Sequence, residues 1–442
     1  MKTSTFAGFC LALGATVFSA CSASTEVKTE IAKWQYDKQG AVSITYDDGT
    51  VNQFRVAVPI MNRLGLPGTF FINTGTLPGS EWTGRFIGRP IEEIIEETKT
   101  IPTDTVNFYE RASAARYVPV KGANDYFTNA GIEIDAGRKA EACAIIEDFY
   151  KKVVNGQLPP VSPRKGNAKA DPDELTWDKV RQHTAEGHEF ASHMVTHPYM
   201  SALDEANIHY ELDKSREELL KQVGIRATIS AECPYGTGDG RAVGYAQKEY
   251  PALRNGMGLD YLYEIHRGVG ESPVKPECEY VQWQRGILTA TSLDEMKEWT
   301  DVTAGQQNLW LVLVIHGIDG IGWEAMTSAD MDAYFTHIAA DNRLWVATFG
   351  DVTRYIKERM HATVTSQRKG DGTVSVSLDH SLDKALFDLP LTLKTDVDPQ
   401  WNTVDVAQGG KTTTVSVERE GNRAWVTYQA LPGGGEVVLT GK

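Results

Sequence analysis

The chain has 442 residues, of which 41% are hydrophobic, and a formal net charge of -15. This length and apolar content are enough for a sizeable core and for two domains. The acidic balance argues against a nucleic-acid partner, and against anionic surfaces or polyanionic ligands held by bulk electrostatics.

The first 21 residues have the pattern of an export signal. Lys2 precedes an apolar stretch over residues 6–18 that is too short to span a bilayer. Phe18-Ser19-Ala20-Cys21 resembles a bacterial lipobox, which would place a lipid on Cys21; ordinary cleavage near Ala23 is the alternative. We expect an exported protein, either a periplasmic or outer-membrane lipoprotein or a secreted one.

The remaining cysteines give little evidence of a metal site. Cys143, Cys233 and Cys278 contain no C-x-x-C pair, and an odd number of thiols allows one disulfide at most. If a disulfide forms, we favour Cys233 with Cys278; free buried thiols are the alternative.

Two adjacent carboxylates follow the first strand. Residues 41–45 alternate as a short β-branched strand, and Asp47-Asp48-Gly49 stands at its end. Neighbouring carboxylates at the mouth of a buried strand are costly to keep ionised unless they share a cation or a proton. A solvated turn is the alternative, because Asp-Gly is a common turn signal.

The next elements predict a parallel sheet. Residues 51–64 read as a helix closed by Gly65, and residues 69–73 read as a second strand. A strand, helix and strand in this order imply a right-handed crossover between parallel strands. A long insertion over residues 76–174 follows, with helical patterns at 90–100 and 138–154, and it either caps a cleft or is a surface excursion.

A histidine pair follows the strand predicted at residues 189–192. His193 and His197 are four positions apart, so both imidazoles can reach one cation if the segment is helical or turn-like. With one carboxylate they would make a three-ligand site that leaves a position open for water, as catalytic metals require. The alternative is an incidental pair, with Met194 and Val195 in the core.

Further elements complete an alternating pattern. Helices are predicted at residues 177–186, 203–223, 331–338 and 349–359, and strands at 229–231, 309–315 and 344–348. The run at 309–315 is continuously apolar, as buried parallel strands are, and ends at His316. This histidine is either a general acid or a hydrogen-bonded core residue.

Taken in order, these stretches resemble the polysaccharide deacetylase family, the NodB homology domain of carbohydrate esterase family 4. Thr45-Tyr46-Asp47-Asp48-Gly49 is similar to its T-F-D-D-G motif, and residues 187–198 to G-H-E-x-x-x-H-[ST]-x-x-H-P. Residues 68–72, Pro234-Tyr235-Gly236 and the run ending in His316 follow in the family's order. The resemblance covers residues 40 to 357.

This resemblance implies a fold and a reaction. The fold is a distorted (β/α) barrel, and the reaction removes acetyl groups from a polysaccharide or oligosaccharide, for which a neutral glycan fits the chain's charge best. The implied ligands of a divalent metal, with zinc the preferred candidate, are Asp48, His193 and His197. The implied catalytic groups are Asp47 as the base, the backbone N–H of Tyr235 at the oxyanion and His316 as the acid.

The sequence departs from the family pattern at several positions. Glu232 and Cys233 replace the arginine that orients the catalytic aspartate in the family, and Arg285 is a candidate to supply the missing cation. Met194 stands where the family has Ser or Thr. The family's D-W pair is missing, so the partner of His316 stays open.

The chain ends in a region of different composition. From residue 361 the segments at 373–377, 414–417 and 424–428 alternate with period two between Gly, Asn and Asp turns, which predicts a small β-sandwich. The expected layout is therefore a signal at 1–21, the deacetylase domain at 22–360 and the sandwich at 361–442. The last domain either binds glycan, through Trp401, or packs on the barrel.

Three other functions stay open at this point. The first is an O-acetyl esterase acting on acetylated xylan or a similar polymer, which would use the same residues. The second is a different metal-dependent C–N hydrolase on the same fold. The third is a non-catalytic glycan-binding lipoprotein, which we disfavour because every ligand and acid–base position is filled. No nucleic-acid partner is expected, and the membrane would be contacted only through a lipid on Cys21.

Overall fold

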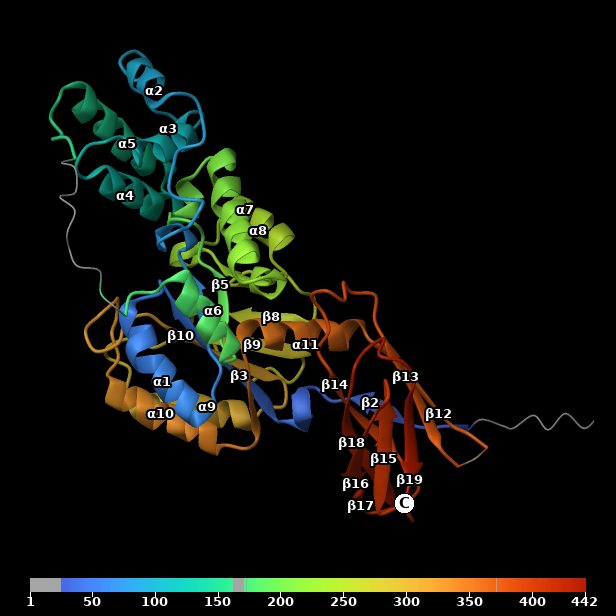
Figure 1. Cartoon of the computed structure of the whole chain (residues 1–442). Coiled ribbons are helices and arrows are strands. Elements are labelled where there is room, and N and C mark those ends of the chain that lie inside the picture. The colour runs from blue at the N-terminus through green and yellow to red at the C-terminus, as the bar shows by residue number, and fades with distance from the viewer. Residues whose placement is uncertain (1–24, 162–170, 172, 371) are drawn as a thin grey trace, which may run out of the picture. The chain divides into compact units, whose positions relative to one another are not determined.

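A computed structural model describes residues 25–161, 171, 173–370 and 372–442 (Figure 1). The expected export signal and Cys21 lie outside these residues. The described chain divides into two compact units, one with residues 31–362 and 380–392 and the other with residues 25–30, 363–379 and 393–442. Within the described ranges, no helix combines the length and apolar character needed to cross a bilayer.

The larger unit is built on a nine-stranded sheet in which every pairing is parallel. The strands, in spatial order, are β7 (Ala252–Arg254), β6 (Ser230–Glu232), β5 (Glu189–Ser192), β4 (Thr69–Ile72), β3 (Gly40–Asp47), β10 (Leu309–Ile315), β9 (Tyr280–Gly286) and β8 (Leu262–Ile265), with β11 (Leu344–Val346) also paired to β3. In the part of the chain described, β7 and β8 are not paired, so the sheet stays open. This α/β arrangement confirms the predicted distorted (β/α) barrel.

The two central strands explain where a site can form. All residues of β3 and β10 are buried, and their register pairs Tyr46 with Ile315. The residues that follow this pair, Asp47 and His316, therefore leave the sheet side by side at its carboxyl end. Active residues of (β/α) barrels lie at this end.

Helices alternate with the strands of the sheet. They are α1 (Val58–Leu64), α6 (Trp177–Ala185), α7 (Glu205–Gln222), α8 (Gly240–Glu249), α9 (Leu293–Ala304), α10 (Ser328–Ala340) and α11 (Phe349–His361). Of these, α8 and α9 were not predicted. The helix expected at residues 51–64 begins with a π-helical turn, η2 (Gln53–Ala57), before α1. Pro59 lies at the start of α1 and has no N–H to donate, which disturbs the regular α-helical ladder there.

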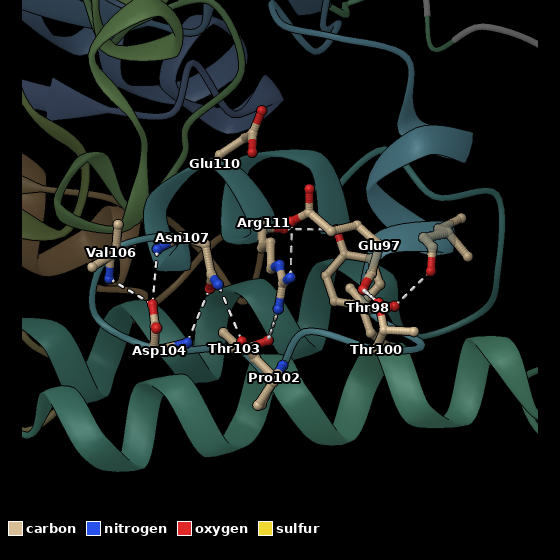
Figure 2. Close-up of polar contacts among 12 residues, drawn as sticks. Glu97, Thr98, Thr100, Pro102, Thr103, Asp104, Val106, Asn107, Glu110 and Arg111 are labelled. Atoms are coloured by element: carbon tan, nitrogen blue, oxygen red, sulfur yellow. Dashed lines mark hydrogen bonds and ion pairs between the residues drawn. The ribbon is translucent and has the colours of Figure 1, made fainter.

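The insertion is a cluster of four helices, α2 (Ile91–Glu97), α3 (Phe108–Ala115), α4 (Ala123–Asp135) and α5 (Lys139–Val154) (Figure 1). The helices expected near 90–100 and 138–154 are confirmed, whereas α3 and α4 were not predicted. Figure 2 shows how buried Arg111 secures the connection from α2 to α3. Its Nη1 donates to Thr103 Oγ1 and its Nη2 to Glu97 Oε1, each at 3.0 Å.

Further short turns connect these elements. They are η1 (Gln35–Asp37), η3 (Thr74–Thr76), η4 (Met200–Ala202), η5 (Ile225–Thr228) and η6 (Pro234–Gly236). Each is a 3-10 turn, and η6 carries the Pro-Tyr-Gly motif.

The remaining strands form two further sheets, which make an all-β region as expected for the tail. One sheet has the order β1-β12-β13-β19-β15-β16 and the other β17-β18-β14-β2. Their bounds are β1 (Thr25–Glu26), β2 (Thr29–Ile31), β12 (Thr363–Arg368), β13 (Val374–Asp379), β14 (Leu391–Asp396), β15 (Thr403–Gln408), β16 (Lys411–Ser416), β17 (Glu418–Glu420), β18 (Arg423–Ala430) and β19 (Val437–Gly441). Every second residue of β18 is buried, as a sheet with one covered face requires.

The suggested pairing of Cys233 with Cys278 is wrong. Both thiols are free, as is that of Cys143. Cys233 follows β6 and Cys278 precedes β9, and β5, β4, β3 and β10 separate these two strands in the sheet. The side chains also pack in different hydrophobic clusters, so the fold keeps the two sulfurs apart.

Candidate active site

Several residues of the predicted motifs have strained backbone conformations. Asp48, Met194, His197 and Tyr235 have φ values of 74°, 67°, 57° and 63°. Positive φ is uncommon for residues with a Cβ, and such strain gathers at functional sites. Here it turns the chain sharply just after the strands β3, β5 and β6, so that these side chains converge.

The first cluster joins one carboxylate and two imidazoles. His197 Nε2 lies 3.3 Å and His193 Nε2 3.8 Å from Asp48 Oδ1. One ligand atom from each of the three residues lies within 4.8 Å of the others. The predicted ligand set is thus brought together, although the histidines sit on a strained turn after β5 and not on a helix.

The hydrogen bonds of the cluster favour binding of a cation. His193 Nδ1 lies 2.9 Å from the carbonyl oxygen of Glu232, which can only accept, so Nδ1 carries the proton and the Nε2 lone pair faces Asp48. Burial lowers the pKa of His193 well below its usual value and that of His197 to about 4, which keeps both imidazoles neutral. Two neutral imidazoles and one carboxylate match the ligand set of catalytic zinc.

The surroundings of Asp48 disfavour the ionised form of its side chain. Burial, and next the charge of Asp47, raise the pKa of Asp48 to about 6. A divalent cation between Asp48 and the two histidines would offset both effects. The residues present therefore fit a metal ion.

The second cluster surrounds Asp47, which is only 1% exposed. Arg254 Nη2 donates to both carboxylate oxygens, at 2.8 and 2.6 Å, and His316 Nε2 lies 3.3 Å from Oδ2. Burial alone would raise the pKa of Asp47, but the charge of Arg254 outweighs it and holds this pKa below its usual value. Asp47 is therefore ionised at neutral pH beside the expected metal ligands.

The suggestion that Arg285 orients Asp47 is wrong, because Arg254 does so. Arg254 ends the short strand β7, in register with Glu232 of β6, and its Nε lies 3.2 Å from Glu232 Oε2. Arg285 instead contacts Glu295 and stacks over Trp299. Nothing in the local sequence marks Arg254 for this role, because β7 has only three residues. Its guanidinium reaches Asp47 through the pairing of β6 with β7.

Tyr235 lies beside the histidines, in the turn η6. Its ring stacks on that of Tyr199 with centroids 3.7 Å apart and meets the ring of His197 edge-on at 4.7 Å. The Tyr235 backbone is thus held next to a predicted metal ligand. Its role at an oxyanion stays a prediction.

His316 follows β10 and has Asp47 as its carboxylate neighbour, which answers the question of its partner. Its Nδ1 is buried and, among the described residues, has no hydrogen-bond partner. Burial lowers the pKa of His316, against the opposing charge of Asp47. The ring of Trp323 packs edge-on against it, with centroids 4.8 Å apart.

Two further residues hold the histidine turn, and sequence reasoning missed both. Buried Glu211 of α7 accepts the backbone N–H groups of Val195 and Thr196, each at 2.8 Å. Arg116, just after α3 of the insertion, donates to Thr196 O at 2.7 Å. A charged residue within a polar helix carries no sign of this role, so only the packing of α7 reveals it. Met194, where the family has a polar residue, is fully buried.

The comparisons agree with the motifs. The family pattern described as polysaccharide deacetylase matches residues 151–250. The resemblance recognised from the motifs is thereby confirmed over these residues.

One curated relative and several solved structures are similar in part. A gellan lyase from a Bacillus species is 29% identical over 280 residues, which are 59% of this chain and only 11% of that protein. A putative polysaccharide deacetylase from Mycobacterium smegmatis is 12% identical, with a TM-score of 0.37 over 75% of this chain and 94% of that one. A family 4 carbohydrate esterase from Streptomyces lividans is 14% identical, with a TM-score of 0.31 over 70% and 91% of the two chains.

Replacing Arg254 should harm both stability and the state of Asp47. In an Arg254→Met protein, Asp47 and Glu232 stay buried without their cation, so we expect a loss of roughly 3–5 kcal/mol in the free energy of unfolding. Arg285→Met should cost less, because the one ion pair that Arg285 forms with the described residues is long and partly exposed. Denaturant titration of both variants measures the difference, and an equal loss in the two would contradict the assignment of Arg254.

Proposed function

We propose that this protein is a metal-dependent deacetylase of an acetylated polysaccharide or oligosaccharide. One observation carries the proposal: a three-ligand cluster of Asp48, His193 and His197 lies next to a separate carboxylate and histidine, Asp47 and His316, which are 3.3 Å apart. Such an arrangement separates ion binding from proton transfer, as hydrolysis by an activated water requires.

Each side chain has a distinct part in the proposed reaction. A divalent ion held by Asp48, His193 and His197, with zinc as the candidate, would supply Lewis-acid chemistry for the acetyl carbonyl and the water. Asp47 accepts the proton of the attacking water, and Arg254 keeps Asp47 ionised and correctly turned.

The charge that develops on the acetyl oxygen and the departing sugar also needs partners. The backbone N–H of Tyr235 donates a hydrogen bond to the oxyanion. His316 gives a proton to the leaving sugar nitrogen or oxygen, and acetate is released. The same residues serve an amide or an ester, so the proposal includes an O-acetyl esterase acting on xylan.

A paired panel of substrates tests this function. After chelation, zinc should restore acetate release from O-acetylated xylan, from N-acetylated chitooligosaccharides or from both, measured with an enzymatic acetate assay. Release that depends on added metal from one substrate alone decides between ester and amide. No release from either, with zinc demonstrably bound, would favour another C–N hydrolase or a binding protein.

Asp47→Asn should abolish most turnover without loss of the metal. The amide cannot accept a proton from water, so we expect acetate release to fall by roughly 10²–10⁴-fold. Zinc content, measured by mass spectrometry, should stay at the wild-type value because Asp47 is not in the ligand cluster. Loss of zinc in this variant would contradict the separation of roles.

His193→Ala should lose the metal and the activity together. Removing one of three ligands lowers affinity for zinc sharply, and the same mass-spectrometric measurement reports it. His209→Ala is the matched control, because His209 is a partly exposed histidine on α7 whose nearest carboxylate, Asp213, is 4.0 Å away. Full zinc content in His193→Ala would remove His193 from the ligand set.

A further inference from the structure

A second feature lies beside the predicted acid, at the carboxyl ends of β8, β9 and β10. A pocket of about 480 Å³ opens here, a volume within the range of small-ligand sites. The residues of its wall that bear on its chemistry are Arg267, Arg285, Leu288, Glu295, His316 and Trp323. The reaction proposed above uses only one of these, His316.

The guanidinium of Arg267 has hydrogen-bond donors that no described residue accepts. In the described part of the chain it donates no hydrogen bond, and its Nη1 is buried. Its nearest carboxylate oxygen, Asp47 Oδ2, is 3.9 Å away, too far for a hydrogen bond. Arg267 lines the pocket, and both oxygens of Asp47 already accept from Arg254, so that carboxylate does not use the donors of Arg267.

Arg285 is held in place without using its donors fully. Its guanidinium lies over the rings of Trp299 and Trp283, 4.6 and 5.5 Å from their centroids. Its one hydrogen bond, to Glu295, is long at 3.4 Å, and its buried Nε has no partner among the described residues. Stacking therefore fixes the plane of the Arg285 guanidinium, while some of its hydrogen-bond donors have no partner among the described residues.

Other buried arginines of this unit behave differently. Arg254 binds Asp47, Arg111 binds Glu97 and Thr103, and Arg354 binds Asp351. Each of these three guanidinium groups has a carboxylate oxygen within 3.0 Å, although Nε of Arg254 and of Arg111 has no hydrogen-bond partner among the described residues. The two arginines of the pocket differ in their distance to a carboxylate, which is 3.9 Å for Arg267 and 3.4 Å for Arg285. These longer distances leave both guanidinium groups able to bind an anion from outside the chain.

Trp323 supplies a surface for a sugar ring. Its side chain is 57% exposed, while its edge contact with His316 and the bond from Gly317 N–H to its carbonyl at 2.8 Å fix its position. An exposed, fixed indole next to a proton donor suits the apolar face of a sugar.

We propose that this pocket binds an anionic sugar, a residue of the same glycan that carries a carboxylate or a sulfate and lies on the leaving-group side of the acetylated unit. Arg267 and Arg285 bind the anionic group and Trp323 packs on the ring. The inference rests on the proposed function, in which His316 faces the leaving group. It narrows the substrate class to acidic acetylated glycans.

This inference revises the expectation of a neutral substrate. A net charge of -15 repels an anionic glycan at long range, so recognition must come from cations placed at the site. Two arginines within one pocket supply them, and their donors match the oxygens of carboxylate or sulfate.

Calorimetric titration of the full chain with acetyl-free oligosaccharides tests the pocket without any need for turnover. Three ligands of equal length are compared at low salt: a xylo-oligosaccharide, the same oligosaccharide bearing glucuronic acid, and a sulfated form. We expect an anionic ligand to bind roughly tenfold or more tightly than the neutral one. The anionic ligand that binds more tightly than the neutral one shows whether the pocket recognises carboxylate or sulfate.

Variants assign the effect to the pocket. Arg267→Gln and Arg285→Gln should each remove most of the advantage of the anionic ligand, whereas Arg181→Gln, an exposed arginine on α6, should keep it. Leu288→Glu adds a negative charge at a position that is 42% exposed, so it tests the site without burying a new group. It should weaken anionic ligands and leave the neutral one almost unaffected.

The outcomes separate this inference from the proposed function. No binding of either anionic ligand, no advantage over the neutral one, or an advantage that survives all three pocket variants overturns the anionic site. Acetate release in the substrate panel together with such a result leaves the deacetylase intact. An anion advantage without any acetate release would instead keep the pocket and reject the reaction.

Discussion

The buried ion pair between Arg254 and Asp47 is the interaction on which the site depends. Asp47 ends the central strand β3, and Arg254 ends β7 at one edge of the same sheet. Two buried charges of this kind are stable only when both are well hydrogen-bonded, and here one guanidinium nitrogen reaches both carboxylate oxygens. The curvature of the sheet allows residues of its central and edge strands to meet, so the barrel geometry and the ionised state of Asp47 depend on one another.

The ion pair between Arg254 and Asp47 gives the two adjacent aspartates different surroundings. Because Arg254 neutralises Asp47, the neighbouring Asp48 is left to turn, through its left-handed backbone, toward the two histidines. In the proposed reaction, Asp47 is the carboxylate that takes the proton and Asp48 is the one that binds the cation. Adjacent residues in the sequence obtain opposite electrostatic surroundings, which raise the pKa of Asp48 and lower that of Asp47.

The insertion has a structural connection to this site. Arg116, which follows α3, binds the carbonyl of Thr196, and α7 contributes Glu211 to the same turn. The turn that carries His193 and His197 is therefore held from two directions. On the other side of His316, the pocket with Arg267 and Arg285 offers cations that no residue of the described chain uses fully. The histidine cluster and the pocket beyond His316 thus differ in chemistry, since the first fits a metal ion and the second is proposed to bind an anion.

The sequence by itself determined the class of fold and most of the candidate site. Apolar runs predict parallel strands, and Asp47, Asp48, His193 and His316 stand at the ends of such runs, with His197 four residues after His193. The local pattern made these residues candidates, and the resemblance to the deacetylase motifs implied their roles. Arg254, Glu211 and Arg267 could not be found in this way, because their partners lie far away along the chain. Only the register of β6 with β7, the packing of α7 and the neighbouring ends of β8 to β10 decide what these charges face, since electrostatic contacts depend on distance in space.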